Sequence, residues 1–304
     1  MDVYFLGLGN MGLNLALNMQ NKGFTLRAWN RSEEKRTQAQ QKGLNVFSSL
    51  PELFQNRTDS PALVWLMVSA GDAIDEILFG AQGISGLLKP GDIVVDGANS
   101  FYKHTQARAE KLNQMQVKLL DCGVSGGVES ALTGPCLMVG GDADAYEKVR
   151  DLLTQIAQPG GLGYFGTSGA GHYVKMVHNA IEYGMMQSIA EGLNLLKKSP
   201  FHPDLVALTK VWEHGSIIEG RLISFIRKAL EQDPELDKTE PEIGSLGTGL
   251  WASQEALDLG VPLTAITAAV FTRNQSTDSD PFLYKVIQAL RAEFGAHTSN
   301  ERPA

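Results

Sequence analysis

The chain has 304 residues, of which 43% are hydrophobic and 20% charged, a balance typical of a globular protein with one large or two moderate domains. The formal net charge of −8 argues against a nucleic-acid partner, because phosphate neutralisation needs clustered Lys and Arg, but a local cationic pocket can still hold a small anion. The two cysteines, Cys122 and Cys136, are too few for a disulfide scaffold and lack metal-ligand spacing, so we expect no bound metal.

The N-terminal part of the chain alternates short apolar runs with amphipathic segments. It begins directly with a strand-like run, without a basic leader or a long apolar segment, so we expect a cytoplasmic protein with no membrane partner. The predicted strands are β-rich runs with polar or glycine ends: Val3–Leu6, Leu26–Trp29, Leu63–Val68, Ile93–Asp96, Val117–Asp121 and Leu137–Val139. The helices predicted between them are Asn14–Lys22, Ser32–Lys42 and Asp72–Leu78. The alternation predicts a Rossmann-like, doubly wound α/β domain over residues 1–165, with a parallel sheet.

Strand patterns nearly vanish after a glycine-rich segment at residues 160–163. A long helix is predicted from Gly171 to Lys198, where Ser199-Pro200 ends it. Further helices fit Pro203–Trp212, Gly220–Glu231, Gly249–Leu259 and Pro262–Arg273, whereas Glu231–Pro241 and the tail after Phe294 read as irregular. We therefore expect an all-α domain over residues 166–304.

The hexapeptide Gly7-Leu8-Gly9-Asn10-Met11-Gly12 follows a predicted strand and opens a predicted helix. In this context the first glycine permits a tight turn, the second admits a pyrophosphate, and the third lets helix and strand pack closely. The N–H groups at the start of the helix can then bind the anion. The pattern predicts a dinucleotide-binding turn.

The end of the second predicted strand indicates which dinucleotide binds. Its residues Asn30-Arg31-Ser32 include no carboxylate to accept from a ribose hydroxyl, whereas Arg31 can hold a 2′-phosphate. NADP is therefore favoured over NAD. The alternative is that Arg31 is merely solvated beside Glu33 and Glu34, which leaves cofactor choice loose. Ser32 can cap the following helix, bond the phosphate, or do both.

The predicted long helix carries four polar residues on one face. Lys175, His178, Asn179 and Glu182 have the three-, four- and seven-residue spacings that place side chains together. Such a stripe is either a solvated or buried polar face or a site.

With these segments in this order, the chain resembles 6-phosphogluconate dehydrogenase, the decarboxylating enzyme of the pentose phosphate pathway, in its short form. The matching segments are GLGNMG at 7–12, NRS at 30–32, DGANS at 96–100, GVSGG at 123–127, GPCLMVGG at 134–141, GHYVKMVHNAIEYGMMQ at 171–187, GTGLW at 247–251 and RAEFGAHT at 291–298. The resemblance covers almost the whole chain and implies oxidation and decarboxylation of 6-phospho-D-gluconate to D-ribulose 5-phosphate with NADP.

The resemblance also implies residue roles. Lys175 would be the general base at the C3 hydroxyl as hydride leaves for the nicotinamide, and Glu182 would protonate C1 of the enediol left by decarboxylation. These roles require a neutral amine and a protonated carboxyl, states that burial favours. Arg291 and His297 would come from the tail of a partner subunit, making a dimer obligatory, although an ordinary solvated tail is the alternative. The other implied substrate ligands are Asn99 (also against the cofactor), Ser125, Gly126, Gly127, His178, Asn179, Tyr183, Thr248 and Arg273.

Some positions depart from the family pattern and put substrate affinity in doubt. They are Val128–Ala131, Glu219, Leu246 and Leu250. A 3-hydroxyacid dehydrogenase of the 3-hydroxyisobutyrate type is the runner-up, since it shares the glycine turn and a helical Lys–Asn pair. Glu182 argues against it, as does the set that the resemblance implies for binding the 6-phosphate: Tyr183, Arg273, Arg291 and His297. A catalytically inactive NADP-binding sensor is a third reading, against which intact Lys175 and Glu182 speak.

Overall fold

The computed structural model describes residues 2–239, 243 and 247–276. The chain forms two compact units, residues 1–179 and 180–304, and the division falls inside a single long helix, α8 (Ala170–Lys197). The boundary expected from the sequence, between residues 165 and 166, lies between the last strand and this helix.

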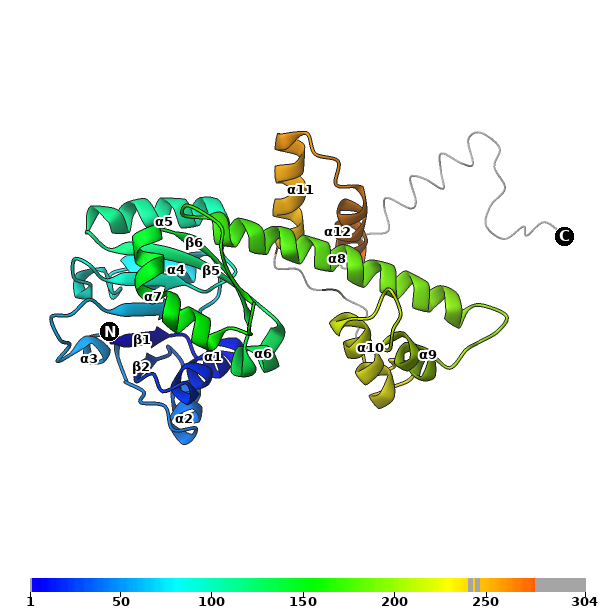
Figure 1. Ribbon diagram of the computed structural model, residues 1–304, viewed down its shortest axis with the longest axis horizontal. Helices are drawn as coiled ribbons and strands as arrows, with labels where there is room; N and C mark the ends of the chain where they lie inside the picture. The colour runs from blue at the N-terminus through cyan, green and yellow to red at the C-terminus, as the bar shows by residue number, and fades with distance from the viewer. Residues whose placement is uncertain (1, 240–242, 244–246, 277–304) are drawn as a thin grey trace. The chain divides into compact units, whose positions relative to one another are not determined.

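Unit 1 is built on one seven-stranded sheet in the order β2-β1-β3-β4-β5-β6-β7 (Figure 1). Its strands are β1 Val3–Leu6, β2 Leu26–Trp29, β3 Leu63–Leu66, β4 Ile93–Asp96, β5 Lys118–Ser125, β6 Cys136–Gly141 and β7 Leu162–Tyr164. All neighbouring pairs are parallel except β5 with β6. The Rossmann-like class is confirmed. The sequence analysis did not predict the antiparallel pair, which arises because residues 126–135 are too few for a parallel crossover.

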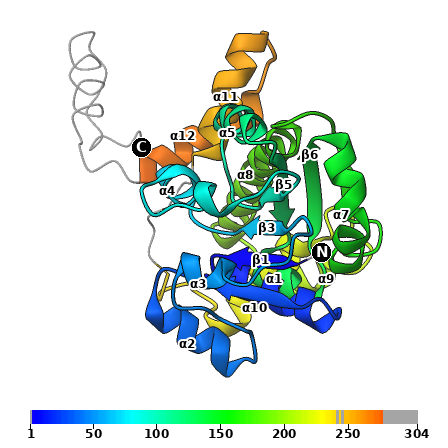
Figure 2. The same cartoon turned by 90° about the vertical axis from the view of Figure 1, so that its left-hand side faces the viewer.

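Helices cover both faces of the sheet, because strand side chains alternate between two cores. Phe5 and Trp65 belong to one apolar cluster, and their neighbours Leu6 and Leu66 to the other. In Figure 2 the strands lie between α4 and α5 on one side and α7 on the other. The helices are α1 Asn10–Asn21, α2 Glu33–Gln41, α3 Leu50–Phe54, α4 Asp72–Phe79, a 3-10 turn at Ser85–Leu87, α5 Tyr102–Gln114, α6 Gly127–Thr133 and α7 Ala143–Ile156.

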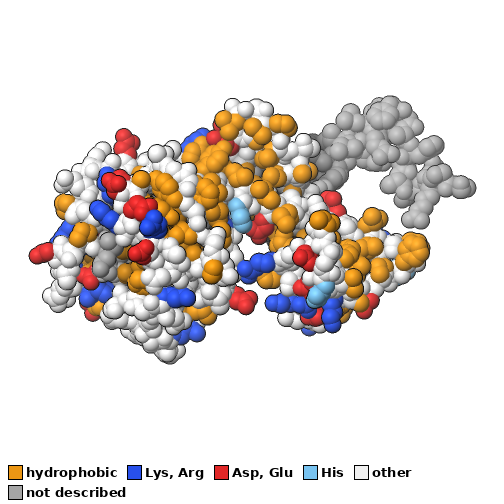
Figure 3. All heavy atoms as spheres, in the orientation of Figure 1, with side chains coloured by type: hydrophobic (Ala, Val, Ile, Leu, Met, Phe, Trp, Pro, Cys, Tyr) orange, Lys and Arg blue, Asp and Glu red, His pale blue; other side chains and the backbone are white. Residues whose placement is uncertain are grey.

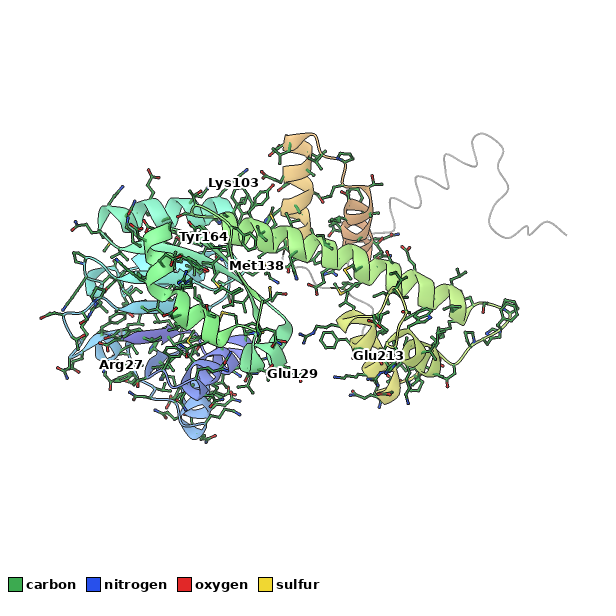
Figure 4. The ribbon with its side chains drawn as sticks, viewed as in Figure 1. Arg27, Lys103, Glu129, Met138, Tyr164 and Glu213 are labelled. Atoms are coloured by element: carbon green, nitrogen blue, oxygen red, sulfur yellow. The ribbon has the colours of Figure 1, made fainter. Side chains whose placement is uncertain are left out.

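Hydrogen bonds from side chains secure both edges of the sheet. At the β2 edge, Arg27 donates from Nε to the carbonyl of Leu53, 2.6 Å away, and so ties α3 to the strand. At the other edge, the Tyr164 hydroxyl donates to the carbonyl of Gly141 over 2.8 Å. Figure 4 labels Arg27 and, on neighbouring strands β6 and β7, Met138 and Tyr164. Strand β7 was absent from the sequence prediction because its run of three residues is half-buried and lacks a clear alternation.

The described part of unit 2 is helical, as predicted. Beyond the second half of α8 it contains α9 Leu205–Trp212, α10 Arg221–Gln232, α11 Thr248–Leu259 and α12 Thr264–Ser276. Asp204 caps α9 by accepting from the N–H groups of Val206 and Ala207. Helix α9 packs on α10, and α11 packs on α12. No helix in the described ranges is long and apolar enough to cross a bilayer.

Candidate active site

The glycine turn between β1 and α1 has the geometry that its sequence predicts. Gly7 has φ +106°, and a Cβ there would be 2.2 Å from the carbonyl oxygen of Met67. A Cβ on Gly12 would be 2.0 Å from the carbonyl oxygen of Gly7. Both positions are therefore closed to any larger residue. A Cβ on Gly9, in contrast, would have no atom within 4 Å, so this face of the turn is open to a ligand.

The start of α1 is suited to an anion. Gly9 is its N-cap and offers no side-chain cap, and the first turn carries no acidic residue. First-turn N–H groups have no partner inside a helix and lie at the positive end of its dipole. By comparison, α3 and α7 are capped by Ser49 and Asp142. The open turn and the uncapped helix together fit a dinucleotide pyrophosphate.

The end of β2 is tied to this turn. Asn30 Oδ1 accepts from the N–H of Leu8 over 2.9 Å, so this predicted cofactor residue braces the glycine turn. The Arg36 guanidinium donates to the carbonyls of Asn30 and Arg31, each over 2.9 Å. Arg31 itself is exposed and makes no side-chain hydrogen bond or ion pair with the described residues. Ser32 is the N-cap of α2, but its side chain makes no capping bond.

The turn after β4 presents Asn99. The buried Asp96 carboxylate accepts from the N–H of Ala98 over 3.0 Å and from the Ser100 hydroxyl over 2.9 Å. Gly97 lies tight against β3, where a Cβ would be 2.6 Å from Trp65 Nε1. Asn99 is thus held between two anchored neighbours.

Helix α8 begins on a buried carboxylate. Asp121 of β5 is fully buried and accepts from the N–H groups of Gly169 and His172, each over 2.8 Å. A negative charge at a helix N-terminus is favourable, and two N–H bonds compensate for its burial. The approach is close, because a Cβ on Gly171 would be 2.5 Å from the carbonyl oxygen of Met138. This docking fixes where the following turns of α8 place their side chains.

Two turns further on, α8 and its surroundings bring the predicted base into a polar cluster. The Lys175 side chain is buried, and its Nζ lies 3.5 Å from His178 Nδ1. His178 Nε2 lies 3.0 Å from Ser125 Oγ on β5. Asn179 Nδ2 donates to Asn99 Oδ1 over 3.3 Å, and Asn179 Oδ1 lies 3.2 Å from His178 Nδ1. Residues that the sequence analysis selected from three separate segments, namely the predicted long helix, residues 96–100 and residues 123–127, therefore meet in unit 1.

The hydrogen bonds select one tautomer of His178. Because the Asn179 amide nitrogen is directed to Asn99, its oxygen faces His178 and can only accept. In this amide orientation, a neutral His178 ring that donates from Nδ1 to Asn179 accepts at Nε2 from the Ser125 hydroxyl. The same Nδ1 atom lies 3.5 Å from Lys175 Nζ, so the imidazole fixes where the amine lies.

Unit 2 brings together the predicted phosphate-binding residues. Tyr183 of α8 is buried, and the Arg273 guanidinium lies 3.6 Å from its ring centroid in a cation–π contact. The Thr248 hydroxyl donates to Tyr183 Oη over 3.5 Å. Gly249 permits this arrangement, because a Cβ there would be 2.8 Å from the Tyr183 ring.

The structure places the remaining predicted substrate and catalytic residues as follows. Glu182 is half-buried on α8, next to Tyr183 in sequence. Gly126 and Gly127 have φ values of +120° and +78° in the turn between β5 and α6. Arg291 and His297 lie outside the described residues. Among the departures from the family pattern, Glu219 accepts from the N–H of Gly215, so its carboxylate serves a local turn.

Sequence reasoning missed the residues that hold the site in place. Asp121 had a detectable signal, since an aspartate within a buried strand is rare without a partner. Arg36 and Arg108 gave none, because each lies in a largely polar helix. In the described part of the chain, no group of three His, Cys, Asp or Glu side chains could hold a metal ion.

Two family descriptions match the chain over nearly its whole length. The NAD-binding domain of 6-phosphogluconate dehydrogenase matches residues 2–177, and the 6-phosphogluconate dehydrogenase C-terminal domain matches residues 171–283. The chain belongs to the 6-phosphogluconate dehydrogenase family. The resemblance seen in the sequence is confirmed, and the chain is accordingly an NAD(P)-binding oxidoreductase of this family.

Individual relatives differ in length and cofactor. The decarboxylating 6-phosphogluconate dehydrogenase of Staphylococcus aureus (strain N315) is 41% identical over 283 residues, 88% of this chain and 60% of that protein. The NAD(+)-dependent decarboxylating enzyme of Bacillus subtilis (strain 168) is 37% identical over 288 residues, 90% of this chain and again 60% of that protein. YqeC of the same strain, described only provisionally as a 6-phosphogluconate dehydrogenase, is 34% identical over 99% of this chain and its own full length.

Solved structures agree in fold. Plasmodium falciparum 6-phosphogluconate dehydrogenase, determined as apo form and with NADP+ and 6-phosphogluconate, has a TM-score of 0.80 and 32% identity, over 99% of this chain and 67% of that one. Mycobacterium tuberculosis 3-hydroxyisobutyrate dehydrogenase has a TM-score of 0.70 at 20% identity, over 90% of this chain and 92% of that one. The second likeness extends to the fold alone. The chain spans about 60% of the length of several decarboxylating relatives.

Proposed function

We propose that this chain oxidises and decarboxylates 6-phospho-D-gluconate to D-ribulose 5-phosphate and CO2, with NADP as hydride acceptor. The observation that carries the proposal is the cluster of Lys175, His178, Asn179, Ser125 and Asn99, in which a buried amine lies among hydroxyl, amide and imidazole groups. A sugar acid presents hydroxyls and a carboxylate, which such groups can bind. Family membership supports the same reaction.

In the proposed mechanism Lys175 acts first. Its neutral amine accepts the proton of the C3 hydroxyl, and the bound dinucleotide supplies the hydride acceptor for C3. The resulting 3-keto acid loses its carboxylate as CO2, the neighbouring ketone takes the electron pair, and the protonated Lys175 returns its proton to that oxygen to give the enediol. Glu182, seven residues along α8, then donates a proton to C1 of the enediol. His178, with its proton on Nδ1, orients the amine and the sugar hydroxyls.

The cofactor proposal rests on the end of β2. A side chain there that can accept from the ribose 2′-hydroxyl would favour NAD, whereas the exposed Arg31 favours a 2′-phosphate. Its guanidinium has no partner among the described residues, so no ion pair must break when a phosphate binds. An NAD-dependent relative at 37% identity makes this a question for direct measurement.

We also propose that the chain is a homodimer. Large apolar side chains of unit 2 are exposed in the single chain, among them Leu250 at 48%, Leu257 at 82% and Phe271 at 66%. Figure 3 shows apolar side chains gathered on the visible surface over α11 and α8. Exposed patches of this kind mark association surfaces. In such a dimer Arg291 and His297 of each tail would bind the partner's substrate phosphate.

The decisive experiment is a steady-state assay with 6-phosphogluconate and either NADP or NAD, following reduced cofactor and released CO2 together. We expect equal amounts of both products, and Lys175→Met should abolish both while NADP binding persists. Reduced cofactor without CO2, or equal turnover of 3-hydroxyisobutyrate, would favour the 3-hydroxyacid dehydrogenase. NADP binding without any turnover would favour the sensor.

A further inference from the structure

We propose that Arg108 is a positioning residue that fixes Asn99 for the proposed reaction, on which the inference rests. Arg108 lies on α5 and is 2% exposed. None of the sequence motifs includes Arg108. Its hydrogen bonds and ion pairs go to Ser100, Asp96, Asp75 and Gly71, and therefore not directly to Lys175 or Asn99. Its importance comes from the two loops that its guanidinium joins at the carboxyl edge of the sheet.

The first loop follows β4 and carries Asn99. Arg108 Nη1 donates to Ser100 Oγ over 3.3 Å and lies 3.6 Å from Asp96 Oδ2. Asp96 in turn holds the N–H of Ala98 and the Ser100 hydroxyl. The residues on both sides of Asn99 are thus linked, directly or through one carboxylate, to the same guanidinium.

The second segment is the loop after β3 together with the first turn of α4, in which Asp75 lies. Arg108 Nε and Nη2 donate to the two carboxylate oxygens of Asp75 over 3.0 and 2.6 Å, and Nη2 also donates to the carbonyl of Gly71 over 3.2 Å. This bidentate bond lowers the pKa of the Asp75 carboxyl below its usual value. A planar guanidinium can donate two parallel bonds to one carboxylate while its other N–H groups reach further acceptors, whereas a lysine ammonium has all three donors on one nitrogen and cannot form this fork.

The turn held by Arg108 reaches the base through short polar links. Asn99 Oδ1 accepts from Asn179, whose own oxygen faces His178, the neighbour of Lys175. A shift of the turn therefore moves Asn99 Oδ1, the acceptor that orients the Asn179 amide. The contact between the Asn179 oxygen and His178 then changes as well. Ligands bind at the carboxyl edge of a parallel sheet, so a buried ion pair at this edge affects a site as well as stability.

The same strand supplies a matched control at its other end. Arg57 is bidentate to Asp92, just before β4, with Nη2 to Oδ1 at 2.6 Å and Nη1 to Oδ2 at 2.9 Å. The side chains of Arg57 and Asp92 are 6% and 0% exposed. Both guanidiniums are buried, although the carboxylate of Asp75 is 46% exposed, and the Arg57 pair lies at the amino edge of the sheet. It should contribute to stability without touching the site.

The test compares Arg108→Lys with Arg57→Lys in the full chain. Both variants should lower Tm, since each leaves a buried aspartate less well paired. Only Arg108→Lys should lower kcat with 6-phosphogluconate, by about ten- to a hundred-fold, as expected for a displaced positioning group. A kcat of Arg108→Lys within about two-fold of wild type would overturn the proposal, as would equal losses of kcat in both variants.

A second measurement keeps the inference independent of the reaction. Hydrogen exchange of the peptide containing residues 97–101 should be faster in Arg108→Lys than in wild type and unchanged in Arg57→Lys. Unchanged exchange in both variants would overturn the inference even if the enzyme is active. If wild type does not turn over 6-phosphogluconate, the proposed function fails and the exchange result alone decides whether Arg108 fixes the turn. Should Arg108→Lys not fold, Ser100→Ala removes one of its bonds and is measured in the same way.

Discussion

Gly123 lies directly against Lys175: a Cβ built on Gly123 would be 2.4 Å from Lys175 Cβ and 2.8 Å from its Cγ. The glycine of β5 therefore leaves the space that the proposed base occupies. Lys175 is buried at this point, so its side chain has little freedom to move away. A backbone position within a strand thus determines where an amine on a helix can lie.

We expect Gly123→Ala to lower kcat/KM by about a hundred-fold or more, because the added methyl displaces the Lys175 stem. Cofactor affinity should change little, since the glycine turn after β1 is separate. Steady-state kinetics and NADP titration measure the two effects. Gly86→Ala is the control, because a Cβ on Gly86 would meet no atom within 4 Å. An active Gly123→Ala enzyme would contradict the proposed placement of the base.

Arg31→Ala should remove most of the preference for NADP. A charge-assisted bond to phosphate contributes about 1.5–3 kcal/mol, so kcat/KM with NADP should fall by about ten- to a hundred-fold, while the value with NAD stays nearly constant. Initial rates with each cofactor give the ratio. Arg150→Ala, on the exposed surface of α7, serves as the control. A wild-type preference for NAD would refute the role of Arg31.

Arg273→Lys should weaken binding of the substrate phosphate. The lysine amine loses both the planar stack on Tyr183 and the bidentate grip on phosphate, so KM should rise by about ten-fold or more. The measurement is the KM for 6-phosphogluconate. Arg221→Lys is a matched control, because Arg221 lies over the ring of Phe225 at 5.5 Å in the same unit. Similar increases from both variants would argue against a phosphate site at Arg273.

Removing residues 291–304 should raise KM for 6-phosphogluconate in the dimer that we propose. The expected cause is loss of two phosphate ligands, Arg291 and His297, each a donor to a doubly charged group. Removal of residues 299–304 alone retains both residues and should leave KM unchanged. Sedimentation of each truncated form checks that association persists. An unchanged KM in the longer deletion would exclude the tail from the site.

Asp142 should contribute stability that acid removes. Its carboxylate caps α7 by accepting from Ala145, and the Lys118 amine lies 3.1 Å from it. The Ala145 N–H bond is the main cause that lowers the pKa of Asp142 in the folded protein. Since the folded pKa lies below the unfolded value of about 3.9, this stability is complete above about pH 4 and is lost as the pH falls through the folded pKa.

We therefore expect Asp142→Ala to lower the free energy of unfolding by about 1 kcal/mol at pH 7. The difference from wild type should shrink toward pH 3. Urea unfolding at pH 7, 5 and 3 measures it. Asp142→Asn keeps a capping oxygen without the charge, so its loss of stability at pH 7 should be smaller, and the difference between Asp142→Asn and Asp142→Ala should be independent of pH. A difference between wild type and Asp142→Ala that grows on acidification would contradict this account.

Much of the fold could be predicted, because most of its strands and helices have recognisable local sequence patterns. The first five strands were placed within a few residues, since each is an apolar run with clear ends. Helix α5 was missed because its sequence is mostly polar and only Thr105, Arg108 and Leu112 are buried. The reversal at β6 could not be seen either, because strand direction depends on how residues 126–135 close in space.

The sequence by itself determined the groups on which the proposed chemistry depends: the glycine turn, Arg31 at the end of β2, and the proposed base and acid on one helix. These features can be read from the sequence because each depends on residues close together in the chain. A tight turn needs glycine at fixed positions, and a helix places residues seven apart on one face. Only the tertiary structure decided how that chemistry is held. Gly123 makes room for Lys175, Asp121 anchors α8, and Arg108 joins two loops, because contacts between distant segments form only when the sheet and its helices pack.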